Sequence, residues 1–186
     1  MLRILALVCL MALAPVTARA QAAPNPGAGD FDWELGLWDT HVEVRGPLDA
    51  DAPWAVFEGT SDVRPLSRGR ANTVDLSLTN AAGARIEGVA LRLFNPQSSQ
   101  WSINFASMND GLLTAPVYGG FTDGRGEFYG QDSVDGRVVM VRLVISDVTA
   151  DSARFVQSWS ADGGRTWIDN WIATDTRRAG SPGGAR

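Results

Sequence analysis

The chain has one cysteine and no lysine, and both scarcities limit its chemistry. The single cysteine, Cys9, lies in an N-terminal segment that the sequence predicts to be removed, which leaves the rest of the chain without a thiol. Disulfides, thiolate catalysis and cysteine-ligated metal sites are therefore excluded. Because the chain has arginine but no lysine, Schiff-base chemistry and a P-loop lysine are excluded as well.

Positive charge is also scarce. The formal net charge is −5, and the chain loses two further positive charges, Arg3 and Arg19, with the predicted signal segment. An acidic chain without a basic run is a poor nucleic-acid binder, so no nucleic-acid partner is expected. After the N-terminal segment, no apolar run is long enough to span a membrane, and no membrane span is expected.

Histidine occurs once, at His41, between Asp39 and Glu43 on one face of an expected strand. Imidazole and carboxylate groups together suit several divalent ions. Residues two apart on an exposed strand face are more often simply solvated, so we expect neither a metal site nor a cofactor.

Both ends of the chain read as segments outside the fold. Residues 1–20 combine an early arginine, an apolar run over 4–14 and Ala18-Arg19-Ala20, which is the pattern of a secretory signal peptide. We therefore expect an exported protein, either periplasmic or secreted. Residues 21–29 predict a flexible linker and residues 179–186 a disordered tail, with one domain over 30–178 between them.

Within this domain, apolar and polar residues alternate along almost every segment between turns. Such alternation predicts strands with one buried face. The expected strands cover residues 38–45, 54–63, 73–78, 86–94, 101–105, 125–131, 139–145, 154–160 and 167–176. Turn sequences such as Asp123-Gly124 and Asp135-Gly136 separate them. The pattern predicts an all-β fold, either a sandwich or a closed up-and-down barrel.

The start of the first strand favours the barrel. Gly36-Leu37-Trp38 in "FDWELGLWD" resembles the G-x-W opening of lipocalin-like proteins. The stretches "LFNPQSSQWSINFAS", "GEFYG" and "SWSADGGRTWIDNWI" resemble a bacterial calycin-type family of uncharacterised function. The resemblance implies a single antiparallel, lipocalin-like barrel of about eight to ten strands. It also implies that Trp38 closes one end beneath Arg177 or Arg178.

A second motif, "SADGGRTW" at residues 160–167, resembles the Asp-box of sialidase-type β-propellers. A propeller needs about four to eight blades, and the motif occurs here once. We therefore predict a hairpin turn in which Asp162 accepts backbone hydrogen bonds and Gly163 or Gly164 has a positive φ. In the simplest register Gln157 lies opposite Asp169. A bulge would place it opposite Asn170.

The candidate ligand-binding residues are aromatic or basic. They are Trp101, Phe105, Tyr118, Phe128, Arg92 and Arg142. The aromatic residues suit a pocket wall as well as a packed core. Each arginine interrupts an apolar strand, and an inward arginine must be paired or reserved for an anionic ligand. The alternative is an outward arginine whose stem covers the barrel wall.

The longest connection, residues 107–119, carries several apolar side chains, including Met108, Leu112 and Leu113. We expect them to fold over the barrel mouth as a lid or to rest on the outer wall.

Three functions remain open from the sequence. The leading hypothesis is a non-catalytic, exported binding protein for a small hydrophobic or amphipathic molecule. The second is an isomerase or hydrolase that uses Glu127 or a buried arginine; a raised pKa of Glu127 would favour it, and a normal pKa would argue against it. The third is a structural or interaction module with a filled core. The pattern favours no particular oligomeric state.

Overall fold

The computed structural model describes residues 27–180, so the predicted signal peptide, residues 21–26 of the predicted linker and the end of the predicted tail lie outside the described residues. The elements are η1 (Asp32–Glu34), β1 (Gly36–Val44), β2 (Ala55–Leu66), η2 (Ser67–Gly69), β3 (Ala71–Thr79), β4 (Arg85–Asn95), β5 (Gln100–Ser107), β6 (Val117–Thr122), β7 (Arg125–Val134), β8 (Arg137–Ser146), β9 (Ser152–Ser160) and β10 (Ile168–Arg177).

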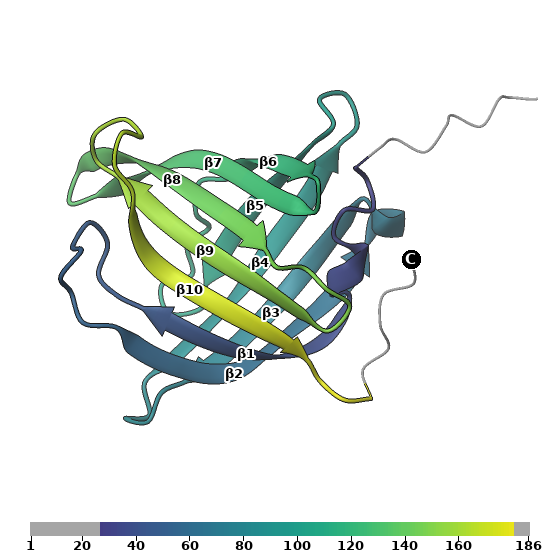
Figure 1. Cartoon of the computed structure of the whole chain (residues 1–186), viewed down its shortest axis with the longest axis horizontal. Coiled ribbons are helices and arrows are strands. Elements are labelled where there is room, and N and C mark those ends of the chain that lie inside the picture. The colour runs from purple at the N-terminus through teal and green to yellow at the C-terminus, as the bar shows by residue number, and fades with distance from the viewer. Residues whose placement is uncertain (1–26, 181–186) are drawn as a thin grey trace, which may run out of the picture.

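The described strands form one closed antiparallel barrel, which confirms the expected fold class (Figure 1). Each strand pairs with the next in sequence, and β10 pairs with β1 to close the ring. Closure leaves no free sheet edge in the barrel. The loops after β1, β7 and β9 lie together at the left of Figure 1, and η1 lies at the opposite end.

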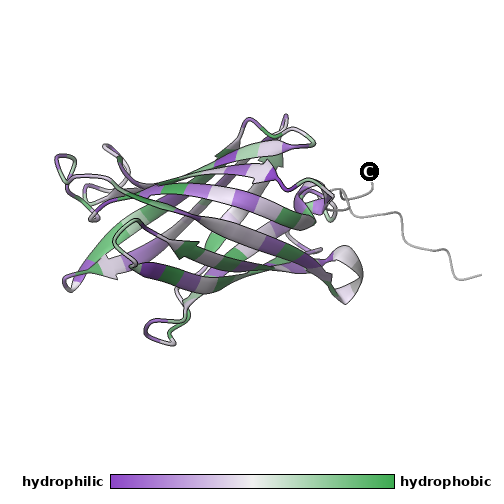
Figure 2. Cartoon of the chain, turned by 90° about the horizontal axis from the view of Figure 1, so that it is seen from below, coloured by the Kyte–Doolittle hydropathy of each residue, from purple (hydrophilic) through white to green (hydrophobic). Residues whose placement is uncertain are grey.

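Hydrophilic and hydrophobic residues alternate along the strands (Figure 2). In a closed barrel this alternation puts one set of side chains inside and the other outside. On β3, Val74, Leu76 and Leu78 are buried, whereas Asp75 between them is exposed. The apolar inward set supplies the core, because burial of apolar surface is the main favourable contribution to folding.

The shortest turns have the chemistry that the sequence predicts. Asp123-Gly124 joins β6 to β7 and Asp135-Gly136 joins β7 to β8, each as a two-residue connection. All four residues have positive φ, between 50° and 77°. This is the backbone of type I′ hairpin turns, whose twist matches that of the flanking strands.

One strand was missed, and the apolar side chains expected to form a lid or to rest on the outer wall are not buried. Residues 117–122 form β6, so the connection shortens to residues 108–116. Its end runs along β5, where the Thr114 amide donates to the Phe105 carbonyl at 2.8 Å. Met108, Leu112 and Leu113 remain more than half exposed. Pairing of the backbone with β5 holds the segment in place without their burial.

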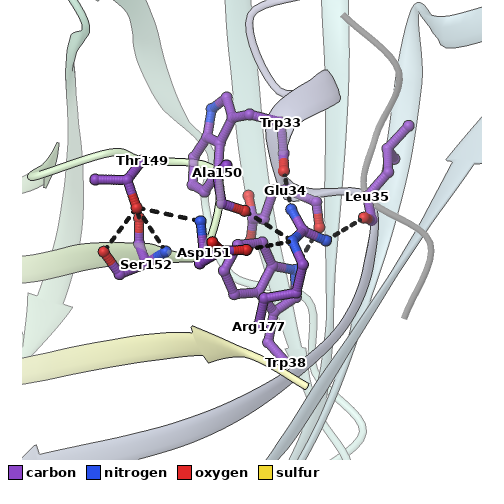
Figure 3. Close-up of polar contacts among 9 residues, drawn as sticks. All are labelled: Trp33, Glu34, Leu35, Trp38, Thr149, Ala150, Asp151, Ser152 and Arg177. Carbon is purple, nitrogen blue, oxygen red and sulfur yellow. Dashed lines mark hydrogen bonds and ion pairs between the residues drawn. The ribbon is translucent and has the colours of Figure 1, made fainter. Parts of the chain in front are cut away.

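The closed end of the barrel is built around Trp38, as the G-x-W pattern predicts. Trp38 is fully buried, and its indole donates to the Glu34 carbonyl of η1 at 2.5 Å. Arg177 lies over the Trp38 ring at 4.1 Å and donates to the carbonyls of Trp33 and Leu35 (Figure 3). Arg177 is therefore the arginine that the resemblance implies, and it ties η1 to the end of β10.

The segment before η1 belongs to the same end. The Gly27 carbonyl accepts a hydrogen bond from the Trp101 indole at 2.8 Å, and Ala28 packs against the core. Residues 27–29 therefore form part of the barrel floor rather than a flexible linker.

The "SADGGRTW" hairpin confirms the predicted turn. Asp162 accepts hydrogen bonds from the amides of Arg165 and Thr166 and from the Thr166 hydroxyl, at 2.7 to 3.0 Å. These bonds, first the one from the Thr166 amide, hold the pKa of Asp162 well below its usual range. Gly163 and Gly164 both have positive φ.

Both registers expected for this hairpin were wrong. Gln157 pairs with Trp171, because a bulge between Asp169 and Trp171 leaves Asn170 as the extra residue. The extra residue shifts the alternation by one position, so that Trp171 points inward. Asp169 points outward and accepts a hydrogen bond from the Ser158 hydroxyl at 2.7 Å. The bulge thus places an aromatic side chain inside the barrel.

Candidate functional site

A cavity of about 320 Å³ lies inside the barrel. Its walls are mostly apolar and aromatic, and they come from strands all around the ring. The wall includes the large apolar side chains of Phe105, Leu143, Phe155, Trp159 and Trp171. Several of these side chains point inward by register but are only partly buried, because the space they face is open. The cavity contradicts the alternative of a filled core.

A glycine helps to shape the wall at Phe105. Gly88 lies on β4 beside the Phe105 ring, and a Cβ there would meet the ring at 2.2 Å and the Ala106 carbonyl oxygen at 2.7 Å. Only glycine leaves room for the ring to lie across the neighbouring strand.

The cavity floor, toward the closed end, is polar. Arg92 of β4 reaches Glu34 of η1 with both terminal nitrogens, and one of these contacts measures 3.0 Å. Both side chains are buried, and the guanidinium also lies 4.3 Å from the centre of the Phe31 ring. A bidentate pair of this kind satisfies most of the hydrogen-bonding capacity of both groups.

Asp175 of β10 is the second carboxyl group at this floor. It lies between Thr40 of β1 and Ala153 of β9, and it is 4% exposed. Burial raises its pKa to about 7, and the Glu34 carboxylate adds to this effect, while Thr40 and Arg92 oppose it. Its Oδ1 atom has no hydrogen-bond partner within residues 27–180.

Two of the six predicted ligand-binding residues line this cavity. Arg92 is at the floor and Phe105 is in the wall. Trp101 and Phe128 also point inward, but they pack against Phe31 at the closed end. The ring centre of Phe31 lies 4.9 Å from that of Trp101 and 6.0 Å from that of Phe128. Their placement as cavity residues was wrong, because η1 and the preceding segment fill that end.

The other two predicted residues lie outside the barrel. Tyr118 pairs with Tyr129 on the outer face of β6 and β7 and is half exposed. Arg142 lies on the outer wall, 4.6 Å from the centre of the Trp167 ring, and donates to the Ser158 hydroxyl at 3.3 Å. The outward alternative therefore holds for Arg142, because its strand neighbours Val141 and Leu143 take the inward phase.

Sequence reasoning missed Glu34 and Asp175. A signal for Asp175 was present, since it continues the inward phase of Trp171 and Ala173 along the last strand. An acidic residue in phase with a buried face marks an interior carboxyl group. Glu34 had no comparable signal, because its position depends on how η1 folds beneath the barrel.

The acid proposed for catalysis, Glu127, is on the outer face. Hydrogen bonds from Arg125 and Tyr129 lower its pKa, whereas a general acid would need a raised pKa. This result argues against the enzyme hypothesis in the form that uses Glu127. Within residues 27–180 no group of three histidine, cysteine, aspartate or glutamate residues is placed to hold a metal ion. No helix in the described part of the chain is long and apolar enough to cross a membrane.

Comparisons with known proteins give structural likeness without sequence relatives. No family model and no curated protein match the chain. The S-type phycobiliprotein lyase CPES from Guillardia theta matches with a TM-score of 0.54 and 10% identity, covering 80% of this chain and 90% of that one.

Two further solved structures match with lower scores. EF1p2_mFAP2b bound to DFHBI matches with a TM-score of 0.46 and 10% identity, covering 82% of this chain and 99% of that one. A de novo designed fluorescence-activating β-barrel matches with a TM-score of 0.45 and 11% identity, covering 81% of this chain and 98% of that one. At such identities the likeness to the lyase shows the fold alone, which is that of a closed antiparallel β-barrel.

Proposed function

We propose that this chain is an exported, lipocalin-like binding protein that holds one small hydrophobic or amphipathic molecule inside its barrel. The observation that carries the proposal is the interior cavity, with aromatic walls and a few polar groups at one end. Ligand sites in proteins have this composition, and their volumes start at about 300 Å³. Export rests on the signal-like pattern of residues 1–20.

The two ends of the barrel support a single entry route. The floor is closed by Trp38 and by Phe31, both buried. At the other end, Thr114 and Ala115 of the connection 108–116 border the cavity. A ligand would therefore enter past this connection and come to rest with its far end near Asp175.

The test uses N-phenyl-1-naphthylamine, an uncharged dye whose fluorescence rises in apolar surroundings. Titration of the purified protein is expected to give saturable binding of one dye molecule per chain. Ala90→Trp projects an indole into the cavity, because Ala90 lies on the inward face of β4. Val89→Trp is the matched control, because its neighbouring position faces outward.

The dye is expected to bind the wild type and Val89→Trp alike, and to bind Ala90→Trp at least about tenfold more weakly, a difference of about 1.4 kcal/mol. Absence of saturable dye binding to the wild type, or equal binding to both tryptophan variants, would refute an interior site.

A further inference from the structure

The charges at the cavity floor restrict what the polar end of a ligand can be. Arg92 is the cation that lines the cavity, and both of its terminal nitrogens are engaged by Glu34. Its charge is therefore already compensated, which disfavours the carboxylate of a fatty acid or another anionic group, although its Nε atom has no hydrogen-bond partner within the described residues. An anion at the floor would instead approach the carboxylates of Glu34 and Asp175.

Asp175 has the opposite property. It lines the cavity, it is almost fully buried, and its Oδ1 atom lacks a partner within the described residues. A buried acceptor without a donor is costly, and a ligand that supplies the donor removes that cost. The groups that face Asp175 are Thr40 from β1, Ala153 from β9, Glu34 from η1 and Arg92 from β4. Only the last of these is a cation, and it is already paired.

We infer that the ligand is a hydrophobic amine, whose ammonium group binds Asp175 at the cavity floor while its apolar body packs against the aromatic walls. This inference rests on the proposed function and specifies the chemical class of its ligand. An ammonium group donates to the unpartnered oxygen and neutralises the local excess of carboxylate charge. The nearby aromatic rings of Phe155 and Trp171 also suit an organic cation.

The experiment compares three probes with the same eight-carbon chain, namely octylamine, 1-octanol and octanoate. Each is used to displace N-phenyl-1-naphthylamine from the wild type at pH 8. This pH lies above the pKa of Asp175, which is about 7, while an alkylamine remains charged. Because the apolar chain is constant, differences in affinity report the headgroup.

Octylamine is expected to bind about tenfold or more tightly than 1-octanol, since a hydrogen bond between charged groups is roughly twice as strong as a neutral one. Octanoate is expected to bind most weakly. Asp175→Asn keeps the shape of the side chain and removes its charge, so the preference for octylamine over 1-octanol should disappear. Dye affinity within about twofold of the wild type shows that the variant keeps its cavity.

Asp132→Asn is the matched control, because Asp132 also borders the cavity and the substitution removes the same charge. The preference for octylamine should survive in this variant. Equal binding of octylamine and 1-octanol to the wild type, tighter binding of octanoate, or a preference that survives Asp175→Asn would overturn the inference. These outcomes are distinct from failure of the proposed function, in which the dye itself does not bind.

Discussion

Glu34 and Asp175 are both buried carboxyl groups, but only Glu34 has a cation directly against it. Burial of a charge in a low-dielectric interior is costly unless a partner compensates it. Arg92 compensates the Glu34 carboxylate with two hydrogen bonds, whereas burial raises the pKa of Asp175 to about 7. The two residues therefore predict different responses to substitution.

For Asp175, the free energy of unfolding should depend on pH. Its pKa is about 7 in the folded chain and about 3.9 in an unfolded chain, so the folded state holds more protons between these values. Its contribution to stability therefore falls as the pH rises from 4 to 7, by about 1.4 kcal/mol per unit. Asp175→Asn removes this contribution, so urea unfolding should show the variant gaining stability over the wild type as the pH rises. A constant difference from pH 4 to 8 would contradict the shift.

For the ion pair, Arg92→Met should destabilise the fold by about 3–5 kcal/mol, because it leaves the Glu34 carboxylate buried and unpaired. The double variant Glu34→Leu with Arg92→Met should recover most of that loss, since both charges are then removed. Urea unfolding of both variants measures this. A double variant less stable than Arg92→Met would contradict the view that the loss in Arg92→Met comes from the unpaired Glu34 carboxylate.

At the scale of elements, one side chain from the last strand joins separate segments at the closed end. Arg177 donates to the carbonyls of Trp33, Leu35 and Ala150 and stacks on Trp38 (Figure 3). These carbonyls belong to two segments far apart in sequence, so the guanidinium group joins them where no strand pairing does.

Arg177→Lys should therefore loosen η1 specifically. Lysine keeps the charge but lacks the planar fork, so at least one of these hydrogen bonds is lost, at about 1–3 kcal/mol. The amides of Glu34 and Leu35 bond within the η1 turn. Their hydrogen exchange should be faster in Arg177→Lys than in the wild type, while exchange of the amides in β3 should stay the same. Uniform acceleration over the whole barrel would contradict a local role.

The wall at Phe105 gives a second prediction at this scale. Gly88→Ala should push the Phe105 ring out of its place and lower dye affinity, since a Cβ at Gly88 overlaps the ring and the Ala106 carbonyl. Dye titration of Gly88→Ala and of Gly83→Ala compares this site with a glycine of the β3–β4 turn, where no neighbouring atom lies within 4 Å. Gly83 has a φ of +81°, so its variant controls for general strain. Equal dye affinity in both variants would contradict the role of Gly88.

Most strands were predictable because their two faces differ. Alternation along β1 or β3 appears in the sequence because one face is apolar and the other polar. β6 escaped because its sequence, VYGGFT, has two glycines and no polar alternation. The register of β9 and β10 was predicted wrongly, because a bulge depends on packing at the hairpin and does not appear in the alternation of the sequence.

At the scale of the whole molecule, the barrel is packed at one end and hollow in the middle. Phe31, Trp101 and Phe128 fill the closed end, so the cavity begins above them. The sequence predicted that Trp101, Phe105 and Phe128 point inward, but not which of them meet a neighbour across the barrel, and it wrongly included Tyr118. That distinction depends on η1 and the segment before it, which occupy one end of the interior.

The central claim is that the interior binds a small molecule, and native mass spectrometry tests it most directly. The protein is purified from its own source without detergent, and its native mass is compared with its denatured mass. The account predicts an excess mass of one small molecule per chain in the native spectrum, which is lost on denaturation. Equal masses, together with no uptake of N-phenyl-1-naphthylamine by the same sample, would contradict it.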